Sequence, residues 1–561
     1  MTPQELSEHL HSCVHAAISV GQLSLDINDV PHQIVVERPK NPDHGDWATN
    51  VALQISKKAG LNPRAAAEIL LPYVMDTEGI ESAEIAGPGF INIRLSIASQ
   101  GELVIDIVEA GNSYGHGDSL AGKSFNMEFI SANPTGPLHL GHSRWAAVGD
   151  AIARVLEAHG AHAIREFYIN DRGVQMDKFG ISTRAAALGQ PIPEDGYHGA
   201  YIPVLAQQIV ANDPQIVNLD EPARTVAFRE AAYELQIADQ QRVLELFNTH
   251  FDVWYSERSL HESGAVDQGF AKLREQGHVF EDGGAVWLRT TDFDDDKDRV
   301  LIKADGELTY FASDTAYYVD KRARGFDVCI YLLGADHHGY VNRLRAVAAC
   351  AGDEPDEHIE ILVGQMVKMM KGGEEVRLSK RAGNIITIED LIDEVGVDAA
   401  RYSLIRYPVD SPLVLDLDLL VQRTSDNPVY YVQYAHARIA SVIRNAADLG
   451  IISADTESWN PADCDPGLLS DQREGQLIRL LADYPRVVTS AVELREPHRI
   501  ARHLEEIATG YHRFYDACRV LPQGDEAATP LTLSRLWLCA ATRQTVFNGL
   551  ELLGVSAPER M

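Results

Sequence analysis

The stretch between residues 125 and 169 constrains the fold most, because two apolar runs of strand length flank an amphipathic helical segment. The strands are predicted at 126–130 and 163–169, and Gly160 ends the helix between them. A strand, a helix and a second strand in this order form a βαβ unit, which implies a parallel sheet. The helix carries its apolar residues at helical spacing: Trp145, Val148, Ile152, Val155 and Leu156. We therefore predict an α/β fold built on a parallel sheet.

The rest of the chain divides into further units around this one. Strand patterns return at residues 328–334 and 359–363, so an insertion interrupts the sheet. Beyond residue 408 we find only helical patterns, which predict an α-helical bundle. The predicted domains are a small α+β domain at 1–110, the parallel-sheet domain at 111–375 with a largely helical insertion at about 198–275, a loop and helical junction at 376–425, and the helical domain at 426–561.

The net charge of −33 limits the partners that this chain of 561 residues can have. A polyanion repels nucleic acid at long range, so an RNA partner has to meet a local basic face. No apolar run approaches the ~20 residues of a membrane-spanning helix, and the sequence does not open on a secretion signal. We therefore expect a cytoplasmic protein with no membrane partner. The six cysteines lack paired spacing, which argues against a structural metal site.

The densest chemical signal is the segment 131–142, which connects the first predicted strand to its helix. His139 and His142 lie three residues apart and share a face of the first helical turn. Gly141 lets a nucleotide approach the backbone, Pro137 lies in the preceding loop, and a helix N-terminus favours phosphate. This pattern predicts an ATP site. The alternative is an ordinary glycine-containing turn with two surface histidines.

A second signal is the basic, glycine-containing loop at 377–384. Arg377, Lys380 and Arg381 place three cations within five residues, next to the hydroxyl group of Ser379. In an acidic protein such a loop is a local anion clamp, suited to the triphosphate of ATP and to the charge that develops on pyrophosphate. The alternative is a solvated surface turn.

Together and in this order, the two segments resemble the HIGH and KMSKS signatures of class I aminoacyl-tRNA synthetases. The resemblance implies a Rossmann-type catalytic domain that uses ATP with Mg²⁺ to form an aminoacyl-adenylate, with no tightly bound cofactor. Arg377 and Leu378 replace the first lysine and the methionine of KMSKS, which keeps the charge. The residues implied for catalysis are His139, His142 and Lys380, and those implied for ATP binding are Pro137, His139, Gly141, His142, Ser379 and Lys380.

The resemblance narrows to the arginyl-tRNA synthetase family and covers nearly the whole chain. It implies an arginine–tRNA ligase, which activates L-arginine and transfers it to the 3′ terminal adenosine of the arginine tRNA, releasing AMP and pyrophosphate. A polar site for a guanidinium group rejects neutral analogues strongly, so little editing is needed, and the insertion looks too short for an editing domain. The motifs that carry this resemblance are 44–50, 87–92, 128–134, 168–171, 251–257, 398–401, 427–438 and 558–561.

The resemblance also implies an arginine pocket. Its predicted residues are Glu128 and Asn133 for the backbone end of arginine, Tyr310 and Asp314 for the guanidinium group, and Asp336 and His338 for arginine or the ribose of ATP. Glu257 is a weaker candidate for a second carboxylate. The alternatives are that Glu128 pairs with a core arginine, that Asp314 caps a helix N-terminus, and that the segment 334–340 binds a metal ion.

For RNA, the family resemblance implies that the C-terminal bundle reads the anticodon and that the N-terminal domain contacts the tRNA elbow. Arginines with nearby aromatic residues suit backbone neutralisation and base stacking. The predicted contacts are Tyr434, Arg438 and Arg502. The alternative is that the aromatic residues are bundle core and the arginines a solvated face.

Two other functions remain open at this point. A nucleotidyltransferase that makes a small-molecule amide or adenylate can share both signatures, but it has no need of a large helical C-terminal domain. A non-catalytic tRNA-binding relative is disfavoured by the intact His139, His142 and Lys380. We expect a monomer whose partners are arginine tRNA, L-arginine and ATP.

Overall fold

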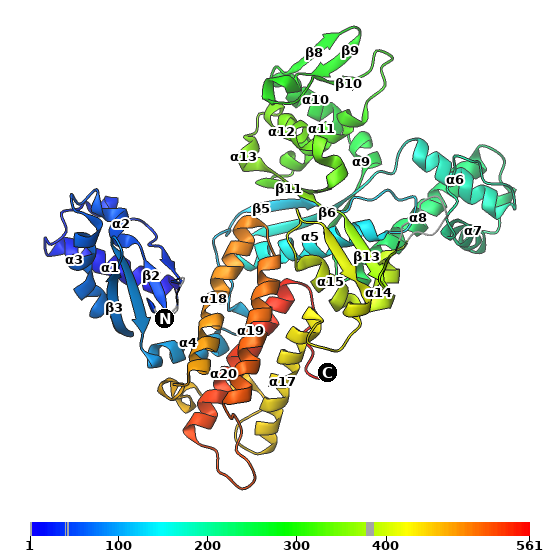
Figure 1. Cartoon of the computed structure of the whole chain (residues 1–561). Helices are drawn as coiled ribbons and strands as arrows, with labels where there is room; N and C mark the ends of the chain where they lie inside the picture. Colours follow the sequence, from blue (N-terminus) through cyan, green and yellow to red (C-terminus); the bar gives the residue numbers. More distant parts are fainter. Residues whose placement is uncertain (1–2, 40, 42–43, 377–385) are drawn as a thin grey trace.

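The computed structural model describes residues 3–39, 41, 44–376 and 386–561. Figure 1 shows a separate N-terminal domain in blue, a central sheet, a green extension above it, and an orange and red helical bundle below. The N-terminal domain has an antiparallel sheet and its own apolar core. Its elements are α1 (Pro3–Ser19), β1 (Val36–Glu37), β2 (Trp47–Thr49), α2 (Val51–Ser56), α3 (Pro63–Met75), β3 (Ile80–Ala86) and β4 (Phe90–Leu95), with sheet order β1-β2-β4-β3.

The central sheet has five parallel strands in the order β12-β11-β5-β6-β7. Its strands are β5 (Ser124–Glu128), β6 (His162–Ile169), β7 (Val253–Ser256), β11 (Val328–Gly334) and β12 (Ile359–Gly364). The chain runs outward from β5 to β6 and β7, then returns to β11 on the opposite side of β5. The strand order therefore reverses at β5 and β11, and ligands bind beyond the carboxyl ends of the strands at such a point. The predicted parallel sheet is confirmed.

Helix α5 (Leu140–Ala158) connects β5 to β6, as predicted. Its apolar residues are buried, and its close fit to the sheet depends on Gly149, where an added Cβ would lie 2.7 Å from the ring of Phe129. The helix ends as the sequence predicts, because Gly160 adopts a positive φ of 82°. The sequence therefore determines where this helix begins, which face it buries and where it stops.

Two short strands lie in regions for which the sequence predicts helices. The insertion contains α6 (Val174–Ala187), α7 (Tyr201–Asn212) and α8 (Ala223–Leu246), but the predicted helical range 198–275 also includes strand β7 of the central sheet. The bundle was predicted to lack strands beyond residue 408, yet β15 (Leu413–Asp416) pairs in parallel with β13 (Val367–Lys371). The range 198–275 is largely helical as predicted, and each prediction overlooks one short strand for the same reason. Each strand is only four residues long, and periodicity over so few residues does not separate strand from helix.

An antiparallel sheet of three strands forms much of the green extension in Figure 1. The extension also carries the helices that flank β11. These elements are α9 (Glu257–Glu262), α10 (Ala265–Glu275), β8 (Val279–Asp282), β9 (Ala285–Leu288), β10 (Arg299–Ile302), α11 (Tyr310–Ala323), α12 (Val341–Cys350) and α13 (Pro355–His358). Helix α11 follows β10 directly and brings its inner face to the carboxyl end of β5 through contacts given below.

The C-terminal bundle shares one continuous apolar core with the central sheet. The helices of this region are α4 (Ile97–Ala110), α14 (Ile388–Val395), α15 (Val397–Ile405), α16 (Leu417–Leu420), α17 (Pro428–Asp448), α18 (Gln472–Leu494), α19 (His498–Ala517) and α20 (Pro530–Leu552). The predicted α-helical bundle is confirmed by α17, α18, α19 and α20. Among the described residues, none of the helices combines the length and apolar character needed to cross a membrane.

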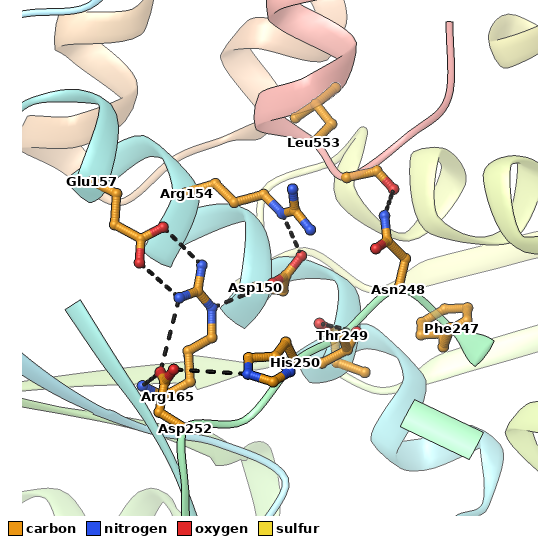
Figure 2. Close-up of polar contacts among 12 residues, drawn as sticks. Asp150, Arg154, Glu157, Arg165, Phe247, Asn248, Thr249, His250, Asp252 and Leu553 are labelled. Atoms are coloured by element: carbon orange, nitrogen blue, oxygen red, sulfur yellow. Dashed lines mark hydrogen bonds and ion pairs between the residues drawn. The ribbon is translucent and has the colours of Figure 1, made fainter. Parts of the chain in front are cut away.

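A buried ion pair ties α5 to the bundle. Asp150 of α5 and Arg401 of α15 are both fully buried, with 2.6 Å between carboxylate and guanidinium atoms. Arg401 also donates hydrogen bonds to the carbonyl oxygens of Phe247, just after α8, and Leu553, just after α20. Figure 2 shows Asp150 beside Arg154, Leu553 above it, and the segment around Asn248 approaching the same junction. Three parts of the chain therefore meet near the middle of the helix that begins with the histidine signature.

Candidate active site

The histidine signature forms the N-terminus of α5. His139 is the N-cap residue, and its Nδ1 accepts a hydrogen bond from the backbone N–H of Gly141 at 3.0 Å. The backbone N–H of His139 donates to Nδ1 of His142 at 3.3 Å, which completes a capping box. The two rings stack with 3.8 Å between centroids. An added Cβ on Gly141 would lie 2.8 Å from the ring of His139, so a larger residue would displace that ring.

The second signature itself lies outside the described residues, because 377–385 include Ser379 and Lys380. The residues that follow it are described, and they pair with the first signature. The backbone N–H of Leu140 donates to the carbonyl oxygen of Ile386 at 3.0 Å, and that of Ile388 donates to Leu138 at 3.0 Å. Thr387 caps α14 in a capping box with Asp390. The segment that starts at Ile386 therefore lies beside His139, and Thr387 forms an isolated antiparallel β-bridge with His139.

Glu128 ends β5 and is held by both of its carboxylate oxygens. Oε2 lies 2.5 Å from Nζ of Lys321, a fully buried side chain of α11. Oε1 accepts a hydrogen bond from the hydroxyl group of Ser131 at 3.1 Å. The alternative that Glu128 pairs with a core arginine is wrong, because the buried cation that contacts Glu128 is a lysine.

The loop after β5 is strained where it turns back toward Glu128. Ile130 and Ser131 have φ values of 67° and 42°, a backbone region that residues other than glycine rarely adopt. Ser131 Oγ, which donates to Glu128, also accepts a hydrogen bond from the backbone N–H of Tyr168 at 3.2 Å. Strain of this kind persists only where surrounding contacts hold it, and it concentrates at functional sites.

Asp314 lies on α11 in a cluster of acidic side chains. Burial, followed by the charges of Glu128 and Glu257, raises the pKa of Asp314 to about 7. Burial also raises the pKa of Glu257, which begins α9 after strand β7. The expectation that Asp314 could cap the helix is excluded, because the N-cap of α11 is Thr309. Tyr310 is 74 % exposed at the start of the same helix, one turn from Asp314.

The remaining predicted pocket residues lie at the same edge of the sheet. Asn133 is exposed in the loop before α5, and its carbonyl oxygen accepts a hydrogen bond from the buried side chain of Gln240 at 3.2 Å. Asp336 follows β11 in a short 3₁₀ segment and is mostly exposed, 3.6 Å from the ring nitrogen of His337. The side chain of His338 lies outside the described residues. Pro137 is half-buried two residues before His139.

Sequence reasoning missed two partners that complete the acidic cluster. Lys321 carries the buried positive charge, and Ser131 fixes the second oxygen of Glu128. A signal for Lys321 was present, since Asp314, Tyr317 and Lys321 occupy positions i, i+3 and i+7 of one helix and therefore share a face. No feature of the sequence predicts the positive φ of Ser131.

The predicted RNA-binding residues occupy two places. Tyr434 stacks on His512 with 5.8 Å between centroids, and Arg438 donates to Nδ1 of the same histidine at 3.3 Å. Arg502 lies elsewhere on α19, where it lines a cleft of about 890 Å³ between the N-terminal domain and the bundle. The structure therefore brings Tyr434 and Arg438 together and separates them from Arg502.

The reversal of strand order at β5 and the stacked histidines beside it, with the chain after residue 385 paired to them, define a class I aminoacyl-tRNA synthetase. Three family models match: "Arginyl tRNA synthetase N terminal domain" at 4–95, "tRNA synthetases class I (R), catalytic domain" at 105–189 and 214–406, and "DALR anticodon binding domain" at 432–561. The chain belongs to the arginyl-tRNA synthetase family and is a ligase of that family.

Individual relatives agree with this assignment. The chain is 55 % identical over 561 residues to an arginine–tRNA ligase of Paenarthrobacter aurescens, and 54 % identical over 562 residues to one of Pseudarthrobacter chlorophenolicus, with 100 % of each chain covered. The solved arginyl-tRNA synthetase of Thermus thermophilus has a similar fold, with a TM-score of 0.74, 21 % identity and full coverage of both chains.

Proposed function

We propose that the acidic cluster at the carboxyl edge of β5 binds L-arginine and that the stacked histidines bind ATP beside it. The observation that carries this proposal is that Glu128 at the end of β5 meets the face of α11 that carries Asp314 and Lys321, with a contact of 2.5 Å between Glu128 and Lys321. Burial and the charges of Glu128 and Glu257 raise the pKa of Asp314 to about 7. Several carboxylates that face one another repel, and a bound cation relieves this repulsion. Arginine supplies two cationic groups, the α-ammonium and the guanidinium, so the site stabilises it at both ends.

Within this site Glu128 and Asn133 take the backbone end of arginine, while Asp314 and Tyr310 take the guanidinium group. Glu257 is the second carboxylate for the guanidinium. This assignment is supported by the positions of Asp314 and Glu257 on the extension side of the pocket and of Glu128 at the end of β5. Asp336 and His338 then face arginine or the ribose of ATP from the end of β11.

The arginine carboxylate attacks the α-phosphorus of ATP, a new oxygen–phosphorus bond forms, and pyrophosphate leaves. ATP enters with Mg²⁺ as the substrate complex. His139 and His142 stabilise charge on the transferring phosphoryl group, and Lys380 stabilises charge on the departing pyrophosphate. A ribose hydroxyl of the terminal tRNA adenosine then attacks the activated carbonyl carbon, and AMP leaves. No protein nucleophile takes part.

For the arginine tRNA we propose two contact regions. Tyr434, with Arg438 beside it, offers a stacking surface for an anticodon base, supported by its exposure and its stacking on His512. Arg502 contacts the RNA backbone from the cleft beside the N-terminal domain, which contacts the tRNA elbow. We further propose that the enzyme acts as a cytoplasmic monomer, supported by the presence of every proposed contact within one chain.

The test is exchange of labelled pyrophosphate into ATP, measured with each of the twenty amino acids and with citrulline, with and without total tRNA. We expect exchange with arginine only. Citrulline has the shape of arginine without its charge, so a site with buried carboxylates should reject it by at least a thousandfold. Exchange that appears only when tRNA is present would show that the activation of arginine requires tRNA. Exchange with another amino acid, or equal use of citrulline, would contradict the proposed pocket.

A further inference from the structure

The side chain of Lys321 is an unusual feature of the arginine pocket, because its ammonium group is fully buried. A lysine charge without a partner is very costly to bury, so such a residue needs a close counter-ion. Its Nζ lies 2.5 Å from Glu128 Oε2 and lies over two aromatic rings, 4.3 Å from that of Tyr317 and 4.1 Å from that of Tyr331. Both rings add cation–π attraction. These contacts hold the ammonium group in one position, where it fixes one carboxylate oxygen of Glu128.

The other oxygen of Glu128 is fixed from the opposite direction. Ser131 donates to Oε1, and Ser131 is itself held by the backbone N–H of Tyr168 in a strained conformation. Glu128 thus has a defined orientation in the structure without a ligand. An ionised carboxylate has about four acceptor positions, so a carboxylate with two of them occupied still accepts hydrogen bonds from a ligand ammonium group.

Lys321 also opposes the repulsion within the acidic cluster. Asp314 lies seven residues before Lys321 on the same face of α11, and Glu257 approaches from α9. Burial and the charges of Glu128 and Glu257 raise the pKa of Asp314, and a nearby cation relieves such repulsion. Lys321 contacts Glu128 directly, so its positive charge lies beside the carboxylate that is proposed to meet the α-ammonium group.

We propose that Lys321 is a positioning residue of the arginine site, which acts by holding the Glu128 carboxylate in the orientation that meets the α-ammonium group of the substrate. This inference rests on the proposed arginine site. A positioning residue differs from one that only stabilises the fold in its effect on the two substrates. Its loss raises the KM for arginine and leaves the KM for ATP unchanged.

The experiment measures the KM for arginine, the KM for ATP and kcat in tRNA-supplemented pyrophosphate exchange for the full-length wild type, Lys321→Met, Glu128→Gln and the double variant. We expect Lys321→Met to raise the arginine KM at least tenfold, with the ATP KM within twofold of wild type. Because Lys321 acts through Glu128, the double variant should have the arginine KM of Glu128→Gln alone. The conservative variant Lys321→Arg, which keeps the charge, should recover most of the affinity for arginine.

Two results would overturn the inference. One is an equal rise of the arginine and ATP KM values in Lys321→Met. The other is a double variant at least tenfold worse for arginine than Glu128→Gln. If Lys321→Met does not fold, the double variant still decides, because removal of both partners leaves no unpaired buried charge. If the wild type shows no arginine-dependent exchange, the proposed function fails; if it does and Lys321→Met leaves the arginine KM unchanged, only this inference fails.

Discussion

The buried pair between Asp150 and Arg401 should dominate the stability of the junction between α5 and the bundle. The perturbation is Arg401→Met, which removes the guanidinium group and keeps a long apolar side chain. Arg401 is fully buried and donates to Asp150, to Thr249 Oγ1 and to backbone carbonyl oxygens near the ends of α8 and α20. Its loss therefore affects three segments at once.

The magnitude follows from these partners. Removal of one member of a buried ion pair costs about 3–5 kcal/mol. Asp150 keeps Arg154 at 2.7 Å and Arg165 at 3.3 Å, and Figure 2 shows both arginines beside it, so the lower end of that range applies. The carbonyl oxygens left without a donor add about 1 kcal/mol. We expect a loss of about 4 kcal/mol, which lowers the melting temperature of a domain this size by about 10 °C.

The assay is thermal unfolding followed by circular dichroism, with Arg406→Met as the matched control. Arg406 lies directly after the same helix and makes a two-point ion pair with Glu505, but the two side chains are 28 % and 22 % exposed. Such a pair contributes about 1 kcal/mol, so the control should lose only about 2–3 °C. Equal shifts for the two variants would refute the reasoning, because burial would then not decide the cost.

Two further predictions concern the pocket and the N-terminal domain. Because the pKa of Asp314 is raised to about 7 and a guanidinium needs the ionised form, the arginine KM should fall about tenfold as the pH rises from 6 to 8 and then level off. In Asp314→Asn this dependence should vanish, and its persistence would assign the titration to another group. Arg38 stacks on Trp47 at 3.7 Å and binds Asp483 of α18, so it should position the N-terminal domain. Arg38→Met should therefore raise the KM for tRNA several-fold in aminoacylation assays. An equal rise in the KM for ATP would contradict this role.

Much of the framework follows from the sequence because it rests on long, strongly periodic segments. Helix α5 and the four bundle helices each span fourteen or more residues, over which apolar spacing, capping residues and glycine stops agree. Strands β5 and β6 were found because they flank such a helix. Thr387 begins α14 with a capping box whose two hydrogen bonds join residues three apart, which is a local signal of the same kind.

The parts that escaped prediction depend on contacts between distant segments. Strand β15 has four residues, and its strand character comes from pairing with β13 some forty residues earlier. The pairing of Glu128 with Lys321 joins residues 193 positions apart. Sequence suggested an acidic residue at the end of β5 and a polar face on α11. It did not show that these two features meet, because only the folded sheet brings α11 over β5.

Buried charge alone does not identify the active site in this chain. Arg401 and Asp150 are as buried as Lys321, yet every donor recorded for Arg401 is directed to an acceptor within the chain, which is the arrangement expected of a structural junction. At the end of β5 a buried cation coincides with a carboxyl group of raised pKa and with a strained turn at Ser131. Each of these costs free energy in the unliganded fold. The strain and the repulsion between carboxyl groups remain even with Lys321 beside Glu128, so their coincidence points to a ligand whose positive charge offsets the repulsion.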